Sequence, residues 1–243
     1  MDARSALLVH TAFEMTAIGV GARLYALNLR RHGQGLLTRG PAFGVAIGCL
    51  LGAIAGSKLA VWLEYPHLVR LYWGSPLLVF TGQSIVGGLI GGLVGVEIAK
   101  KLAGVRRSTG DDFVVPLVVG IAIGRIGCFL AGLHDDTFGV ATAMPWGMDF
   151  GDGVKRHPTQ LYDIMAVLSL GLALTWARPR LAAEPGLEFK LFMTGYLAWR
   201  LVIDALKPVP YSYFHGLSGI QLLAAVFLIG YLPLVFRQLR RLP

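Results

Sequence analysis

The stretch FVVPLVVGIAIGRIGCFLAG, residues 113–132, decides the fold class of this chain. It is apolar over about 20 residues, the length of helix that crosses the ~30 Å hydrocarbon core of a bilayer. Arg125 is its one charged residue, 12 positions beyond Phe113. An ionisable group inside a bilayer is costly unless it meets a partner or water, so Arg125 is a candidate functional residue.

The rest of the chain repeats this apolar pattern. Of the 243 residues, 55% are hydrophobic and 15% are charged, and the mean hydropathy is +0.62. Apolar stretches occur at residues 5–29, 43–63, 84–99, 113–132, 158–177, 189–206 and 217–236. They predict an all-α polytopic membrane bundle of seven transmembrane helices, forming a single transmembrane domain over residues 1–243 with a short periplasmic loop region at 133–156. Glycines such as Gly48, Gly52 and Gly56 would let helices approach closely in lipid.

Basic residues between the stretches set the predicted orientation. The connecting segments alternate between rich and poor in basic residues, and the net charge is +8. The rich segments contain Arg30, Arg31, Arg39, Lys100, Lys101, Arg106, Arg107, Arg178, Arg180, Lys190, Arg237, Arg240 and Arg241. Because basic loops stay in the cytoplasm, the N-terminus is predicted outside and the C-terminus cytoplasmic. This distribution explains the positive charge, so no nucleic-acid partner is predicted.

Arg200 shares the predicted depth of Arg125. Both helices run from inside to outside, and Arg200 lies 11 residues beyond position 189. At about 1.5 Å per residue, both guanidinium groups lie roughly 17 Å above the inner edge. Two cations at one depth predict an anion between them.

Further polar side chains are expected at the same level. The segment HPTQLYD places His157 at the outer rim, with Gln160 and Asp163 one and two turns deeper. Tyr196 and Asp204 lie one turn on either side of Arg200 and share its helix face. The segment GQSIVGG brings Gln83 and Ser84 to the mouth of a fourth helix.

A purely structural interpretation stays open at this point. Arg200 could pair with Asp204 on its own helix, and Arg125 with Asp163 or Asp204, to hold the bundle together. Against this, Ser or Thr would join helices at lower cost, and packing alone does not gather charges at one depth.

The two cysteines give no sign of a crosslink or a metal. Cys49 and Cys128 are the only cysteines, and the topology places them at opposite depths, too far apart for a disulfide. Neither has a ligand-type neighbour in the sequence, so we predict no metal site, and no nucleotide or other cofactor motif is present.

Four motifs resemble the prolipoprotein diacylglyceryl transferases. GRIGCFLAGLHDDTFG (124–139) is similar to that family's G-R-x-x-N-F-x-N-x-E-x-x-G signature, and RHPTQLYD (156–163) to its R-H-P-S-Q-L-Y-E. GQSIVGGLIGG (82–92) resembles G-M-S-F-H-G-G-L-I-G, and GYLAWRLVID (195–204) resembles G-Y-x-x-F-R-x-x-x-E. The resemblance implies a multi-pass enzyme of the bacterial inner membrane with its active site toward the periplasm. It would move a diacylglyceryl group from phosphatidylglycerol, or a related anionic phospholipid, to an acceptor and release glycerol phosphate.

The resemblance also implies roles for the polar residues. Arg125 and Arg200 match family arginines and are expected to hold the lipid phosphate, since a planar guanidinium suits phosphate and stabilises charge on the leaving group. The expected substrate-binding residues are Gln83, Ser84, Gln160, Tyr162, Asp163, Tyr196 and Asp204.

Departures from the motifs put the acceptor chemistry in doubt. The family histidine is Val86 here, its two signature asparagines are Cys128 and Ala131, and its glutamate falls at Leu133 or, after a two-residue shift, at Asp135. The chemistry could be rebuilt from His134, Asp135, Asp136 and His157 at the same rim, with His134 or His157 as the base and Asp135 or Asp163 orienting its ring. Either this rebuilt chemistry serves a lipoprotein precursor, or the acceptor is another, small nucleophile. Of these we favour a paralogue that uses the same lipid donor with another acceptor. The alternative is a non-catalytic phospholipid-binding or lipid-moving protein, and an ion-coupled transporter is a weaker third.

Overall fold

The computed structural model describes residues 2–31, 40–71 and 82–242, and the chain forms two compact units. Arg39, which contributes to the predicted charge asymmetry, lies outside the described residues. Each of the seven apolar stretches coincides with a helix. In the described part of the chain, five helices are long and apolar enough to cross a membrane: Ala3–Arg31, Ala42–Glu64, Asp111–Asp135, Thr159–Leu181 and Gly219–Leu239.

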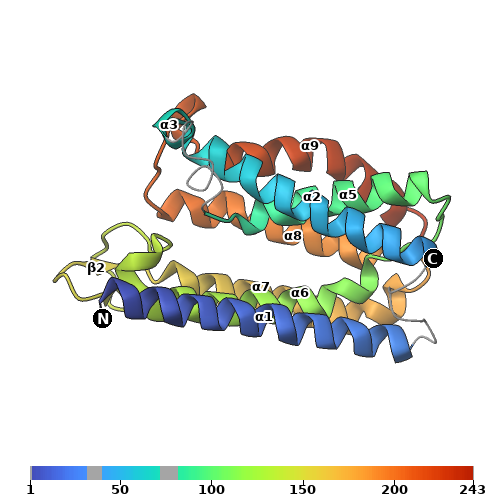
Figure 1. Cartoon of the computed structure of the whole chain (residues 1–243), viewed down its shortest axis with the longest axis horizontal. Helices are drawn as coiled ribbons and strands as arrows, with labels where there is room; N and C mark the ends of the chain where they lie inside the picture. Colours follow the sequence, from blue (N-terminus) through green and yellow to red (C-terminus); the bar gives the residue numbers. More distant parts are fainter. Residues whose placement is uncertain (1, 32–39, 72–81, 243) are drawn as a thin grey trace. The chain divides into compact units, whose positions relative to one another are not determined.

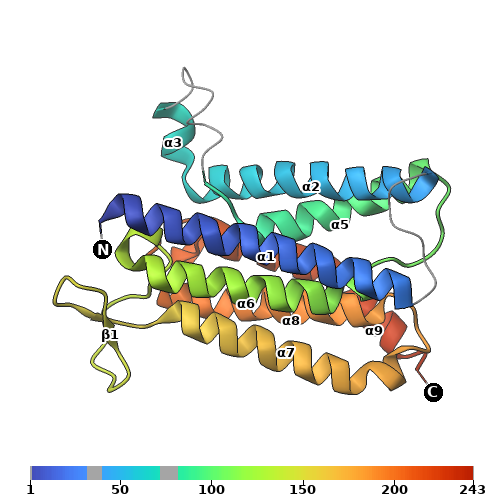
Figure 2. The same ribbon diagram turned by 60° about the horizontal axis from the view of Figure 1, so that its bottom comes forward.

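The first unit is built from α1 (Ala3–Arg31), α6 (Val114–Ala131), α7 (Thr159–Leu181) and α8 (Leu187–Ile203), with the chain end from Val235. The helix α6 packs along α1 and α7, and α8 packs against α7 (Figures 1 and 2). Gly127 allows the first of these contacts, since a Cβ there would lie 2.5 Å from the Cβ of Phe13. This order brings polar residues from α6, α7 and α8 into one interior.

Short segments at the helix ends place the polar residues. The turn η1 (Asp111–Phe113) precedes α6, and the Asp111 carboxylate accepts the N–H groups of Gly186 and Phe189 at the start of α8, at 2.5 and 3.0 Å. Gly132, with φ +63°, ends α6 and leads into η2 (Gly132–Asp135). The turn η3 (Asp204–Leu206) follows α8 and carries the chain to Lys207.

The predicted loop region at 133–156 contains a small antiparallel ribbon. Strand β1 (Met148–Asp149) pairs with β2 (Lys155–Arg156), with Met148 opposite Arg156. The loop is tied to the helices because the Val140 N–H donates to the Leu206 carbonyl at 2.8 Å and the Gly139 N–H to the His157 carbonyl at 2.9 Å. These bonds join η3 to the start of α7.

The second unit contains α2 (Gly40–Glu64), α3 (Pro66–Leu71), α5 (Ile85–Leu102), η4 (Phe214–Gly216) and α9 (Gly219–Leu239) as far as Leu234. Gly48, Gly52 and Gly56 of α2 face glycines of α5 at backbone contact. A Cβ at Gly52 would lie 2.3 Å from the carbonyl oxygen of Gly91, and one at Gly91 would lie 2.2 Å from that of Gly52. Small residues thus bring the two backbones together as expected for helices in lipid.

The N-terminus of α9 is capped in two ways within this unit. Ser218 and Gln221 exchange hydrogen bonds, with the Ser218 N–H donating to Gln221 Oε1 at 3.0 Å and the Gln221 N–H to Ser218 Oγ at 3.1 Å. Glu64, at the end of α2, accepts the Ile220 N–H at 2.8 Å. The carboxylate suits the positive end of the helix dipole.

Candidate functional site

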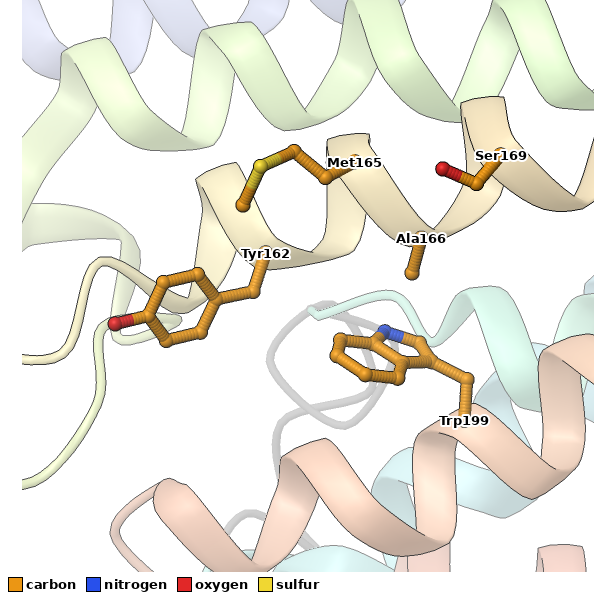
Figure 3. Close-up of a pocket in the computed structure, with 5 residues that line it drawn as sticks. All are labelled: Tyr162, Met165, Ala166, Ser169 and Trp199. Atoms are coloured by element: carbon orange, nitrogen blue, oxygen red, sulfur yellow. The ribbon is translucent and has the colours of Figure 1, made fainter.

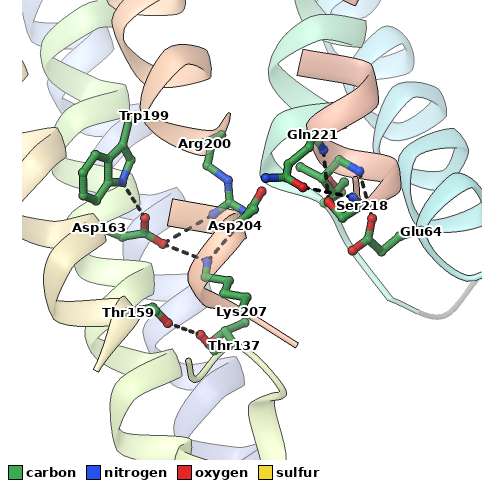
Figure 4. Close-up of polar contacts among 12 residues, drawn as sticks. Glu64, Thr137, Thr159, Asp163, Trp199, Arg200, Asp204, Lys207, Ser218 and Gln221 are labelled. Atoms are coloured by element: carbon green, nitrogen blue, oxygen red, sulfur yellow. Dashed lines mark hydrogen bonds and ion pairs between the residues drawn. The ribbon is translucent and has the colours of Figure 1, made fainter. Parts of the chain in front are cut away.

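Asp163 of α7 lies at the centre of the polar interior of the first unit. It is 1% exposed, and its Oδ2 atom lies 3.0 Å from Arg125 Nε and 3.4 Å from Arg200 Nη1. Its Oδ1 atom accepts the indole N–H of Trp199 at 2.8 Å (Figure 4). The two arginines therefore meet at one carboxylate.

Asp204 and Lys207 complete this group. Asp204 Oδ1 lies 2.5 Å from Arg200 Nη2, and the largely buried Lys207 places its Nζ atom 3.5 Å from Asp204 Oδ1 and 3.4 Å from Asp163 Oδ2. We call Arg125, Asp163, Arg200, Asp204 and Lys207 the ion cluster. Both ion pairs of the structural interpretation thus form, Arg125 with Asp163 and Arg200 with Asp204.

The charges of the ion cluster do not cancel. Its three cations and two carboxylates leave a surplus of one positive charge when all five are ionised. A buried surplus charge is unfavourable by itself, and an anion would relieve it. The ion cluster is therefore suited to bind one singly charged anion.

Buried polar atoms beside the ion cluster lack partners. Among the described residues, Arg200 Nε, the Tyr196 hydroxyl and both amide atoms of Gln160 make no hydrogen bond. Tyr196 is 1% exposed and Gln160 is 0% exposed. Buried polar groups are normally satisfied, so these atoms are candidate contacts for a bound ligand.

An apolar pocket of about 330 Å³ adjoins the ion cluster through Trp199. It is lined by Tyr162, Met165, Ala166 and Ser169 of α7 and by the Trp199 ring of α8 (Figure 3). Because the Trp199 indole forms the pocket wall and donates to Asp163, one side chain joins an apolar surface to the buried charges.

His157 lies at the start of α7 among aromatic side chains. Its Nδ1 atom is 3.3 Å from the Tyr162 hydroxyl, which also accepts the Trp146 indole N–H at 2.7 Å. The ring partner recorded for His157 is thus a tyrosine, where we expected Asp135 or Asp163. His157 and Tyr162 are half-buried.

The structure places the side chains of His134 and Asp135 in different surroundings. His134 is exposed on η2, whereas the Asp135 side chain is 7% exposed and its Oδ1 atom lies 2.6 Å from Nδ1 of His10, a residue of α1. The Thr137 hydroxyl donates to the other oxygen of Asp135. Asp135 therefore orients the ring of His10.

Gln83 and Ser84 belong to the second unit. Ser84 is the N-cap of α5, where its hydroxyl accepts the Gly87 N–H at 3.3 Å, and its own N–H donates to Ser57 Oγ at 2.8 Å. Gln83 is exposed, and Val86, in the place of the family histidine, is buried. Ser84 thus has a clear structural task as a helix cap.

Comparison with known families decides the relationship. The sequence model of the family described as "Prolipoprotein diacylglyceryl transferase" matches residues 7–237. The chain belongs to the prolipoprotein diacylglyceryl transferase family. It is thus an all-α, multi-pass membrane protein of a transferase family, and the family and enzyme class predicted from the motifs are confirmed.

Individual relatives cover most of the chain. The phosphatidylglycerol–prolipoprotein diacylglyceryl transferase of Bordetella parapertussis is 32% identical over 212 residues, which are 82% of this chain and 78% of the relative. The enzyme of the same name from Methylobacillus flagellatus is 32% identical over 208 residues, covering 82% and 76%. That from Nitrosomonas europaea is 30% identical over 227 residues, covering 80% and 77%.

Three residues that contact the candidate site residues in this protein were not predicted from its sequence. Lys207 follows Arg200 and Asp204 at helical spacing, a signal that could have been found, but it lies just beyond the expected span. His10 is a polar residue inside an apolar stretch, and no motif contains it. Trp199 lies within a matched motif, but an aromatic residue in an apolar helix gives no sign of a carboxylate partner.

Proposed function

We propose that this chain transfers the diacylglyceryl group of phosphatidylglycerol to the cysteine thiol of a prolipoprotein. The ion cluster, with its surplus positive charge and neighbouring unpartnered donors, carries this proposal. Phosphatidylglycerol presents one phosphodiester anion, which matches a surplus of one. The shared name of the relatives favours the lipoprotein thiol over the other acceptors considered from the sequence.

The chemistry of the transfer explains why arginines are needed. The acceptor thiol loses its proton to water, its sulfur attacks the glyceryl carbon next to the phosphate, a C–S bond forms, and the C–O bond breaks with its electron pair on the departing phosphate oxygen. The phosphodiester carries one negative charge, and glycerol phosphate leaves with a second one. Donors already aimed at the developing charge lower the barrier, and Arg125 and Arg200 supply them from opposite helices of the interior, α6 and α8.

The neighbouring residues have proposed supporting roles. Tyr196 and Gln160 would donate to phosphate or glyceryl oxygens, and Asp163 and Asp204 would hold the guanidinium groups in place. The apolar pocket beside Trp199 would take part of an acyl chain. His157, with Tyr162, lies near the start of α7 and would face the headgroup.

A reaction with labelled lipid distinguishes the proposed transferase from a non-catalytic lipid-binding or lipid-moving protein. Purified protein in lipid nanodiscs is incubated with phosphatidylglycerol labelled in the headgroup and with a prolipoprotein peptide. Release of labelled glycerol phosphate that requires the peptide cysteine supports the transferase. Binding of the lipid without product would instead support the lipid-binding alternative.

We propose seven membrane crossings, with the N-terminus outside and the site toward the periplasm. The helices α5 and α8, at 18 and 17 residues, would be the short crossings. Single cysteines introduced at Asp149 and Arg106 check this orientation in a chain lacking Cys49 and Cys128. An impermeant thiol reagent applied to intact spheroplasts should label only the former, and labelling of only the latter would reverse the topology.

Lys207 should make lipid affinity depend on pH. Burial, together with the nearby charges of Arg200 and Arg125, lowers the pKa of Lys207 to about 8. The ammonium is therefore charged below pH 8 and lost as the pH rises through 8, which removes the surplus charge. We expect phosphatidylglycerol affinity to fall about tenfold or more over that range, since a hydrogen bond to a charged group contributes ~1.5–3 kcal/mol.

Two lysine variants check this expectation by lipid titration at several pH values. Lys207→Arg should keep its affinity to higher pH, because arginine stays protonated. Lys190→Arg is the matched control, since Lys190 bonds Gln238 Oε1 at 2.6 Å, away from the ion cluster. Identical pH profiles for wild type and Lys207→Arg would remove Lys207 from the binding site.

A further inference from the structure

A second cluster of reactive side chains lies beside the ion cluster in the first unit. It consists of His10 of α1, Cys128 of α6 and Asp135 of η2, each offering one ligand-type atom, and these atoms lie within 4.8 Å of one another. His10 Nδ1 and Asp135 Oδ1 are 2.6 Å apart. A nitrogen ligand from α1 thus joins a sulfur and an oxygen ligand from the consecutive elements α6 and η2.

We propose that His10, Cys128 and Asp135 bind a divalent transition-metal ion of the zinc class. An imidazole, a thiolate and a carboxylate are the ligand types that zinc takes, whereas magnesium and calcium prefer oxygen ligands alone. Three protein ligands leave one position of a tetrahedral ion open, as in catalytic rather than structural zinc sites. We call these residues the three-ligand site.

Two neighbouring side chains contact the ligands of the three-ligand site. The Thr137 hydroxyl donates to Asp135 Oδ2, and Asp135 Oδ1 faces His10 Nδ1 at 2.6 Å. Arg125 Nη1 lies 3.9 Å from Cys128 Sγ. Such outer contacts orient ligands and tune metal affinity. An ion would replace the direct contact of His10 with Asp135, because two ligand atoms at about 2.0–2.2 Å from a tetrahedral ion lie roughly 3.4 Å apart.

Charge balance allows a metal ion next to Arg125. A divalent ion with one thiolate, one carboxylate and a neutral imidazole has no net charge. The ion would therefore not oppose the guanidinium, and the ion cluster would keep its surplus. His10 has a side chain that is 34% exposed, so the site is accessible from the protein surface, whereas Cys128 is buried.

The open position of the metal would bind the acceptor thiol, and this part of the inference rests on the proposed function. The thiol S–H bond breaks, its proton passes to water, and a metal–thiolate bond forms. The bound sulfur would then be the nucleophile of the transfer. This would supply a nucleophile where the family histidine and signature asparagine are Val86 and Cys128.

Metal binding can be measured without any turnover. Protein stripped with a chelator is titrated with Zn²⁺ and with Co²⁺, the latter followed by its sulfur-to-metal charge-transfer absorption. We expect about one equivalent per chain, and a 10- to 100-fold or greater loss of affinity in His10→Ala, Cys128→Ser and Asp135→Asn. The charge-transfer absorption should vanish in Cys128→Ser and persist in Cys49→Ser, the matched cysteine control.

Two results would overturn the metal site. One is wild-type affinity no higher than that of Cys128→Ser, and the other is loss of the absorption in Cys49→Ser alone. Cys128→Asn, which restores the family residue, guards against misfolding, because it should keep a wild-type melting temperature while losing the metal.

Activity separates this inference from the proposed function. Equal transfer by the stripped and the Zn²⁺-loaded protein would overturn thiol binding at the metal and leave the transferase standing. Metal bound as expected, without transfer from phosphatidylglycerol under any condition, would overturn the transferase and leave the metal site standing.

Discussion

Replacing Arg125 or Arg200 with alanine should reduce transfer from phosphatidylglycerol by about 10²–10³-fold or more. Removing one preorganised donor that meets developing charge costs ~10²–10³ in rate, and each arginine lies within reach of the same Asp163 oxygen. The measurement is release of headgroup-labelled glycerol phosphate by protein in nanodiscs. Lysine variants should recover little, because a lysine ammonium lacks the planar pair of donors.

Arg178→Ala is the matched control for both variants. Arg178 lies on α7 and forms a bidentate ion pair with Glu188. Its Nε and Nη2 atoms lie 2.9 and 2.8 Å from the two carboxylate oxygens. It touches none of the ion cluster. Arg178→Ala leaves the buried Glu188 unpaired and should lower the melting temperature, but the folded protein should retain transfer. Folding of all variants is checked by size-exclusion profile and melting temperature. Full activity of Arg125→Ala or Arg200→Ala would refute the proposed phosphate contact.

Replacing Asp163 with alanine should destabilise the first unit strongly. Asp163 is 1% exposed and contacts Arg125, Arg200 and Lys207 through one oxygen. Removing one partner of a buried ion pair costs about 3–5 kcal/mol because the other charge is left unpaired. We expect a marked fall of the melting temperature in detergent, partly restored by phosphatidylglycerol, whose phosphate replaces the lost anion.

Asp152→Ala is the matched carboxylate control for this variant. Asp152 pairs with Arg156 at 2.6 Å in the exposed part of the loop region. Its loss should leave the melting temperature unchanged, since exposed pairs contribute little. An equal melting temperature for Asp163→Ala and wild type would contradict the role of Asp163 as the central anion.

The helices were predictable because each corresponds to a long run of apolar residues, a pattern visible within a single segment of the sequence. Each long apolar run had to be helical to satisfy its backbone in lipid, and the observed bounds, such as Thr159–Leu181 for the predicted 158–177, differ mainly at the ends. The ends depend on tertiary contacts, such as Asp111 binding the start of α8. Those contacts join residues about 75 positions apart and have no local pattern.

The ion cluster was only partly predictable. A charge in an apolar helix is conspicuous, so Arg125, Arg200, Asp163 and Asp204 stood out, and four of the five cluster members were named from the sequence. Lys207 was not, because it lies one residue beyond the apolar stretch 189–206, although it keeps the helical spacing of Arg200 and Asp204. Yet it is Lys207 that gives the ion cluster its surplus positive charge, on which the proposed phosphate binding rests.

The partner of Asp135 was not predictable. His134 adjoins Asp135 in the sequence, but η2 turns the two side chains to different surroundings, and the Asp135 carboxylate meets His10 from α1. Only the packing of α1 along α6 brings His10 there. Pairing across such a distance leaves no periodicity in a single sequence.

Lipid selectivity tests the central claim most directly. Affinities for phosphatidylglycerol and for a diacylglycerol with the same acyl chains are compared in wild type and in the double variant Arg125→Gln, Arg200→Gln. The account predicts that wild type prefers phosphatidylglycerol by at least about 100-fold, since two charge-assisted hydrogen bonds contribute ~1.5–3 kcal/mol each, and that the double variant keeps no more than the roughly tenfold share of Lys207. A preference of about 100-fold that survives in the double variant would contradict it.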